Sequence, residues 1–152
     1  MKATPLYLAV FSCFAVVASG VPPLPESGAS KCPVGFEQVD VSYNHSGGQS
    51  VPQLRLAFSN RTDRTIADFM FALSILDSDG NPVRYPSDFT YRRDFPAGAP
   101  ERSHLWKLDP ASIDIHRSGE TVTLLETRFA DGAAWKDDGS RACALTFDYH
   151  AK

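Results

Sequence analysis

The chain has no excess of positive charge. It holds 15 lysine and arginine residues against 18 aspartate and glutamate residues, which gives a net charge of −3. Because proteins that bind nucleic acids neutralise phosphates with a basic face, this balance argues against nucleic acid as a partner. After residue 20 the chain also lacks an apolar run long enough to cross a bilayer, so we expect no stable membrane span in the mature form.

Motifs that carry catalysis are missing as well. There is no Gly-x-Ser-x-Gly elbow for a nucleophilic serine and no Cys-x-x-Cys pair. The histidines are scattered, without the spacing that places two zinc ligands on one helix face; they are His45, His104, His116 and His150. A glycosidase needs two facing acids, and the spacing of the 18 acids singles out no pair. The sequence therefore predicts a protein that is not an enzyme and has no cofactor and no metal.

The first 20 residues have the features of a secretory signal. Lys2 gives a positive start, residues 6–17 form an uncharged apolar run, and residues 18–20 are small, as a signal peptidase requires. An uncleaved anchor and a lipoprotein signal at Cys13 are the alternatives. Cleavage would leave 14 cations and 18 acids, a net charge of −4. We expect a secreted or periplasmic protein with a signal at 1–20, an extended spacer at 21–31 and one domain at 32–152.

Cysteine usage gives a structural prediction. Removal of Cys13 with the signal leaves Cys32 and Cys143, near the two ends of the domain. In an exported protein two such cysteines are expected to pair. The closed loop of about 110 residues would stabilise the fold by roughly 4–5 kcal/mol through chain entropy. A metal pair or a free thiol is the alternative, although neither cysteine has a histidine at ligand spacing.

Alternating apolar residues indicate strands rather than helices. Residues 53–85 are typical of a strand, a polar turn, a long strand, a tight turn at 77–82 and a further strand. We expect other strands at 36–43, 101–108, 121–129 and 143–149. We expect a loop at 44–50 and a longer loop at 86–100, which contains a short edge strand at 89–93. A helical turn is expected at 109–112 and a further turn at 118–119. The predicted fold is all-β, a single immunoglobulin-like antiparallel β-sandwich of about seven strands.

A resemblance supports this fold. Residues 54–80 contain the run L-x-L-x-F-x-N-x-T-x-x-x-I-x-x-F-x-F-x-L-x-x-x-D-x-x-G, which resembles the centre of bacterial exported immunoglobulin-like domains of the FxLYD kind. Late-embryogenesis "water stress" domains, which share a fibronectin-like sandwich, have a similar run. Phe129-Ala130-Asp131-Gly132 with Trp135 is similar to the ends of uncharacterised secreted bacterial proteins. The resemblance implies a fold and supplies no catalytic residue.

Two kinds of polar turn need an interpretation. Asp77-Ser78-Asp79-Gly80-Asn81 has some features of a calcium loop, but no glutamate follows at the distance that an EF-hand requires, so a hairpin turn is favoured. Asp131, Asp137 and Asp138 could bind a hard cation or remain solvated turn residues. Asn44-His45-Ser46 and Asn60-Arg61-Thr62 match the acceptor pattern for N-glycosylation. In a bacterium Asn60 is better explained as a residue that ends a strand.

The segment 84–107 combines arginines with aromatic residues, which binding surfaces favour. The candidate partner-binding residues are Arg84, Tyr85, Tyr91, Arg92, Arg93 and Trp106. Alternatively, the aromatic rings cover the open end of the sandwich while the arginines reach water. We therefore expect an exported, non-catalytic module that interacts with a protein or glycan or with the envelope. A small secreted carbohydrate- or calcium-dependent lectin or enzyme is the alternative. A periplasmic chaperone or inhibitor would need an exposed sheet edge, on which the sequence is silent.

Overall fold

The computed structural model describes residues 32–46, 48–113 and 119–148. The predicted signal and spacer, His116, His150, Ser118 and Tyr149 lie outside these ranges. Nine strands are present in the described part, and they run in the order β1 (Val34–Ser46), β2 (Gln49–Asn60), β3 (Ile66–Leu76), β4 (Pro82–Arg84), β5 (Phe89–Phe95), β6 (Pro100–Lys107), β7 (Gly119–Phe129), β8 (Ala134–Lys136) and β9 (Ala144–Asp148). A single 3-10 turn, η1 (Pro110–Ser112), follows β6. Within the described ranges, no helix has the length and apolar character that crossing a bilayer requires.

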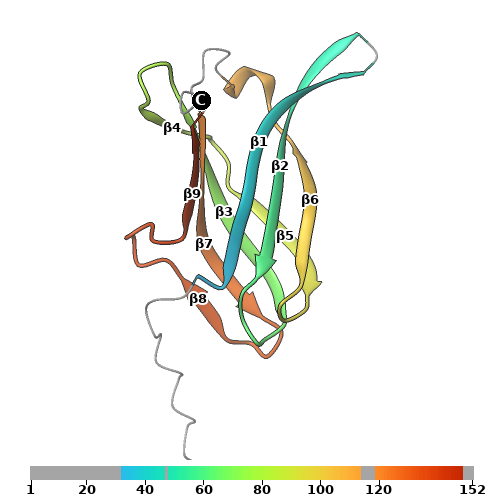
Figure 1. Ribbon diagram of the computed structural model, residues 1–152, viewed down its shortest axis with the longest axis vertical. Coiled ribbons are helices and arrows are strands. Elements are labelled where there is room, and N and C mark those ends of the chain that lie inside the picture. Colours follow the sequence, from blue (N-terminus) through green and yellow to red (C-terminus); the bar gives the residue numbers. More distant parts are fainter. Residues whose placement is uncertain (1–31, 47, 114–118, 149–152) are drawn as a thin grey trace, which may run out of the picture.

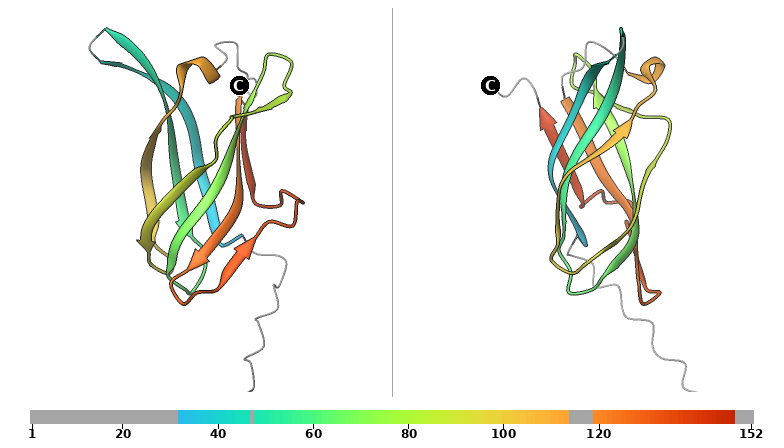
Figure 2. Two further views of the ribbon diagram at one scale, coloured as in Figure 1. Left: turned by 180° about the vertical axis from the view of Figure 1, so that it is seen from behind. Right: turned by 90° about the vertical axis from the view of Figure 1, so that its right-hand side faces the viewer.

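The strands form two antiparallel sheets that face each other (Figures 1 and 2). One sheet has the order β1-β2-β6. In the other, β3 and β7 are central; β4 and β5 pair successive parts of β3, and β8 and β9 pair successive parts of β7. The all-β sandwich predicted from the sequence is confirmed, and the described residues form nine strands where about seven were expected.

Alternation along the strands builds the core, as the sequence pattern predicts. Phe69, Phe71 and Leu73 on β3 are fully buried, and they face fully buried side chains of β2 such as Leu56 and Phe58. The aromatic rings meet mostly edge to face: the Phe58 and Phe69 centroids lie 5.0 Å apart at 79°. Such pairs stabilise a core by about 0.5–1.5 kcal/mol beyond their buried area.

The disulfide joins Cys32 and Cys143, with 5.4 Å between their Cα atoms, so the predicted pairing is confirmed. Cys32 precedes β1 and Cys143 precedes β9. These two strands lie beside each other, although they belong to different sheets. The bond therefore ties the sheets together at one edge, and it indicates an oxidising, non-cytosolic environment.

Two local predictions were wrong, and a third was confirmed only in part. Residues 44–50 are not a loop throughout, because β1 continues to Ser46 and β2 begins at Gln49; Gly48, at φ +78°, lies between the two strands. Gly119 begins β7 instead of lying in a turn. The long loop predicted at 86–100 contains β5, whose seven residues extend the short edge strand expected there. The tight turn closed by Gly80, at φ +80°, and the helical turn at η1 are confirmed.

Candidate functional site: the open edge of the sandwich

Strands β5 and β6 flank the edge of the sandwich opposite the disulfide. Among the described strands, β5 pairs with β3 and β6 pairs with β2, and neither pairs with the other (Figure 2). A tight turn joins them, in which the Ala99 amide donates to the Pro96 carbonyl at 3.1 Å and Gly98 has φ +68°. The chain thus crosses from one sheet to the other and leaves an edge bridged by side chains. We call this the open edge.

The two tyrosines among the candidate residues belong to the core. Tyr85 is 7% exposed, and its hydroxyl accepts a 2.7 Å hydrogen bond from the Asp109 amide. Tyr91 is 3% exposed and stacks on Phe69, with 5.2 Å between centroids. Neither ring offers a surface to a partner. Tyr85 instead anchors the segment that enters η1, and Tyr91 packs the two sheets together.

The arginines, in contrast, point to solvent. Arg84, Arg92 and Arg93 are all exposed. Arg84 makes an ion pair with Asp88 at 2.5 Å. Arg92 and Arg93 make no ion pair with another described residue, since Asp68, which lies opposite Arg92 in the register, accepts from Arg128 at 2.9 Å. Two cations that make no ion pair within the described part of the chain therefore stand at the open edge.

A bulge explains why neighbouring arginines are both exposed. Ile66 and Asp68 on β3 pair with Phe95 and Arg92 on β5, so β5 has one extra residue at this point. An extra residue breaks the alternation of faces and redirects side chains. Strand β6 has a similar irregularity, because Leu56 and Phe58 on β2 pair with His104 and Glu101. Both strands of the open edge thus carry a bulge.

The inner face of β6 supplies a half-buried polar and aromatic cluster. Trp106 packs against Phe71, with centroids 5.1 Å apart at 79°, and lies 4.2 Å from the ring of His104. His104 also meets the Tyr91 ring edge to face at 5.1 Å. The Tyr91 hydroxyl donates to the Glu101 carboxylate at 3.3 Å, across the gap between the sheets. These contacts hold β5 and β6 together without backbone pairing.

The cluster shifts the pKa values of its members. Burial lowers the pKa of His104 below its ordinary value; the Glu101 carboxylate opposes this shift and the Arg93 guanidinium adds to it. Burial, and then the negative charge of Glu101, raises the pKa of Tyr91. At neutral pH the edge therefore presents an uncharged imidazole and phenol between a carboxylate and exposed guanidinium groups.

Of the predicted residues, the structure brings Arg93, Tyr91 and Trp106 to this cluster, with Arg92 adjacent on the surface. Arg84 lies away from it, beside Asp88. Glu101 and His104 also belong to the cluster, although they were not among the predicted site residues. The sequence places both residues in the same predicted strand as Trp106, which could have indicated their role. The bulge in β6 breaks the alternation between them, so the sequence does not show that they lie on the same face as Trp106.

The acidic turns use their carboxylates locally. Asp77 accepts hydrogen bonds from the amides of Asp79 at 2.9 Å and Asn81 at 2.8 Å, and the Asn81 bond is the main cause that lowers the pKa of Asp77. Asp138 accepts from the Ser140 amide at 2.9 Å. Across 32–46, 48–113 and 119–148, no group of three histidine, cysteine or acidic residues has the placement of a metal site.

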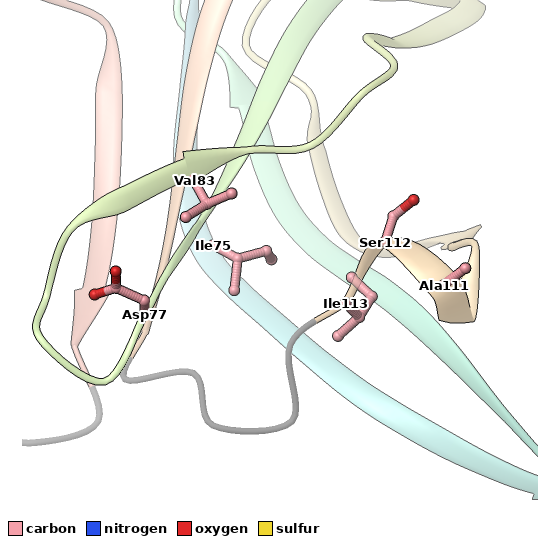
Figure 3. A pocket seen from close by; sticks show the side chains of 6 residues that line it. All are labelled: Ile75, Asp77, Val83, Ala111, Ser112 and Ile113. Carbon is pink, nitrogen blue, oxygen red and sulfur yellow. The ribbon is translucent and has the colours of Figure 1, made fainter.

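A hollow of about 300 Å³ lies at the end of the sandwich where the β3–β4 hairpin faces η1 (Figure 3). Its walls are largely apolar, and no pattern in the sequence indicates it. The lining residues are Ile75, Asp77, Val83, Ala111, Ser112 and Ile113. The Asp77 carboxylate, its charged member, is engaged by the turn.

Asn60 has a structural role at the foot of the open edge. It is 2% exposed, and its side-chain amide donates toward the carbonyls of Arg64, Phe95 and Pro96 at 2.8, 2.9 and 3.0 Å. Its carbonyl oxygen accepts from the amide and the hydroxyl of Thr62. The interpretation of Asn60 as a residue that ends a strand is confirmed, since β2 ends at Asn60.

No protein-family model and no curated protein matches the chain. Among solved structures, it is similar to the crystal structure of a hypothetical protein from Peptoclostridium difficile 630. The TM-score is 0.52 with 10% sequence identity, and the match covers 72% of this chain and 88% of that one. At this identity the similarity concerns the fold alone.

Proposed function

We propose that the protein is an exported, non-catalytic immunoglobulin-like module that binds a partner outside the cytosol or at the cell envelope. The order of strands supports the class. Immunoglobulin sandwiches place strands A, B and E in one sheet and C, F and G in the other, with C′ beside C in the variable type. The order β1-β2-β6 corresponds to A-B-E, and β5-β3-β7-β9 corresponds to C′-C-F-G.

One observation carries the proposed binding role, namely the composition of the open edge. Exposed arginines that make no ion pair with a described residue lie beside half-buried aromatic rings, and arginine and tryptophan are enriched among residues that dominate binding energies. The carboxylates of Asp77 and Asp138 are engaged by backbone amides, so no specific observation favours the lectin or calcium-dependent alternative.

The test measures retention of the mature protein on the envelope fraction of its native host. We compare the wild-type protein with Arg92→Glu/Arg93→Glu, and with Lys136→Glu/Arg141→Glu as a control that changes the charge equally at exposed positions elsewhere. Retention should fall by about tenfold in the first variant, because two steering cations become repulsive, and should be unchanged in the control. Equal retention of all three proteins would reject the open edge as the binding surface.

Export is tested separately, by intact mass of the protein recovered without reductant. A chain that begins near residue 21 and is lighter by two hydrogens is expected. A chain that keeps residues 1–20 would contradict export of a cleaved module.

A further inference from the structure

We propose that the free side of β6 accepts an extended acidic segment of a partner protein as an added β-strand. This proposal rests on the proposed function and names the kind of partner and the mode of binding. It follows from the backbone, the side chains and the charge of the open edge, which point to the same occupant.

The backbone of β6 has the required donors and acceptors. In an antiparallel pair, successive residues direct their N–H and C=O groups alternately toward the partner strand and away from it. Six of the eight residues of β6 pair with β2, Arg102 and Ser103 lie in the bulge, and among the described strands none pairs with the other side. About half of the backbone groups of β6 therefore face away from the sheet, as is typical of an edge that can recruit another strand.

The side chains beside this edge suit an alternating strand. Leu105 points to the outer face, opposite Arg55, and is 48% exposed. His104 and Trp106 point to the inner face, toward the gap that separates β6 from β5, and each is half-buried. An added strand alternates its side chains between the same two faces. The residues of the added strand that point inward would cover His104 and Trp106, so we expect the partner to have apolar residues at those positions.

Charge decides which occupant fits. Five exposed cations surround the edge; they are Arg92 and Arg93 on β5, Arg102 and Lys107 on β6, and Arg55 on β2. The acids beside them are the exposed Asp94 and the half-buried Glu101, together with Asp40 and Asp68, which lie opposite Arg55 and Arg92 in the register; Asp68 is bonded to Arg128. This local excess contrasts with the net charge of −3 for the chain. A second copy of the protein would place like charges opposite each other, which is unfavourable across paired strands. An acidic segment would instead be attracted.

The rival explanation is that the cations only guard an edge strand against pairing, a common protective use of lysine and arginine. The two explanations predict different behaviour for Arg92→Glu/Arg93→Glu, in which the new acids of one copy can face the remaining cations of another. A guarded edge would then begin to self-associate, whereas a docking edge would lose its acidic ligand and remain monomeric.

The experiment uses the disulfide-intact mature protein and pools of blocked peptides as long as β6. One pool alternates aspartate or glutamate with valine, isoleucine, phenylalanine or tyrosine, and a second has lysine or arginine at the charged positions. A third is the acidic pool with alternate backbone amides methylated, which removes hydrogen-bond donors and keeps the charge. Binding is followed by hydrogen exchange of the β6 amides and by the dissociation constant.

We expect the acidic pool to protect β6 and to bind at least about tenfold more tightly than either other pool. Arg92→Glu/Arg93→Glu should weaken this binding by about tenfold, with Lys136→Glu/Arg141→Glu unchanged. Three outcomes would each overturn strand addition: the methylated pool binds as tightly as the acidic pool, the charge-reversed variant self-associates, or the acidic pool fails to protect β6. None of these would by itself reject the proposed function, which depends on the retention of the variants on the envelope fraction.

Discussion

At one edge of the sandwich β1 lies beside β9, and a disulfide joins the residues that precede these strands. At the opposite edge β5 and β6 diverge, and a phenol, a carboxylate, an imidazole and an indole bridge the gap. Both edges hold the same two sheets together. The first does so with a covalent bond, while the second uses side chains that keep polar groups and free backbone near solvent.

Because of this difference, one edge of the sandwich stabilises the fold while the other stays accessible to a ligand. A bond that closes a long loop constrains the unfolded chain whatever happens at the opposite edge. The side-chain bridge can therefore be replaced in part by a ligand while the covalent edge holds the sheets in place. We expect changes at the closed edge to affect stability strongly, and changes at the outermost residues of the open edge to affect binding.

The largest effect should come from the closed edge. The variant Cys32→Ala/Cys143→Ala should lose about 4–5 kcal/mol of unfolding free energy, because the loop across 111 residues is no longer closed. Guanidinium unfolding of the variant and of the wild-type protein measures the difference. The double alanine variant should be insensitive to reductant, unlike the wild type. A loss below about 1 kcal/mol would show that the bond adds little to the fold.

The foot of the open edge should show the next largest effect. Asn60→Ala removes the amide directed at two carbonyl oxygens at the β5–β6 turn and at one, of Arg64, between β2 and β3, and should cost about 2–4 kcal/mol. Gln38→Ala, which removes an exposed amide from β1, is the matched control and should stay within about 0.5 kcal/mol. Urea unfolding of both variants gives the comparison, and similar values for the two would contradict the structural role of Asn60.

The bridge across the open edge should matter less. Tyr91→Phe keeps the ring but loses the hydrogen bond to Glu101, so we expect a loss of about 0.5–1.5 kcal/mol. Tyr85→Phe tests a hydroxyl away from this bridge, the one that accepts from the Asp109 amide. If the bridge is specific, hydrogen exchange in β6 should increase in the Tyr91 variant and not in the Tyr85 variant. An increase in both would indicate general loosening.

The smallest effect concerns pH. Because the pKa of His104 is lower in the folded protein than its ordinary value of 6.5, the unfolded chain binds the proton more readily. This contribution to stability is complete above pH 6.5 and falls as the pH drops from there toward the folded pKa. His104→Gln should flatten the profile in that window. The pKa values of Asp77, Asp131 and Asp138 are lowered from 3.8, so their contributions change at more acidic pH.

Much of the fold could be predicted because long strands keep a strict alternation. Phe69, Phe71 and Leu73 identify β3 from the sequence, and the positions of Cys32 and Cys143 predict their bond. Strand β5 was harder to recognise, since Pro86 and Pro96 flank it and the bulge exposes consecutive residues. The three residues of β8 are too few to show a period.

The candidate site could be predicted only in part. The sequence identifies a segment rich in arginine and aromatic residues, but it does not show which residues of the segment face the core. Tyr91 and Arg92 are neighbours in the chain, yet one is buried against Phe69 and the other is exposed. Only pairing with β3 fixes these faces. The approach of Glu101 to Tyr91 depends on the turn between the sheets, which alternation along a strand does not report.

The disulfide also affects how the protein withstands proteases. Every strand from β1 to β8 lies between the two bonded cysteines, so a single cleavage within that span yields two fragments that remain one covalent molecule. Exposed turns are the preferred sites of such nicks, and Arg141, exposed in the turn before β9, offers trypsin-like enzymes a target. A cut there leaves the fragment that carries β9 tethered next to β1 and β7. The nicked domain can therefore persist and reassemble where a linear chain would separate.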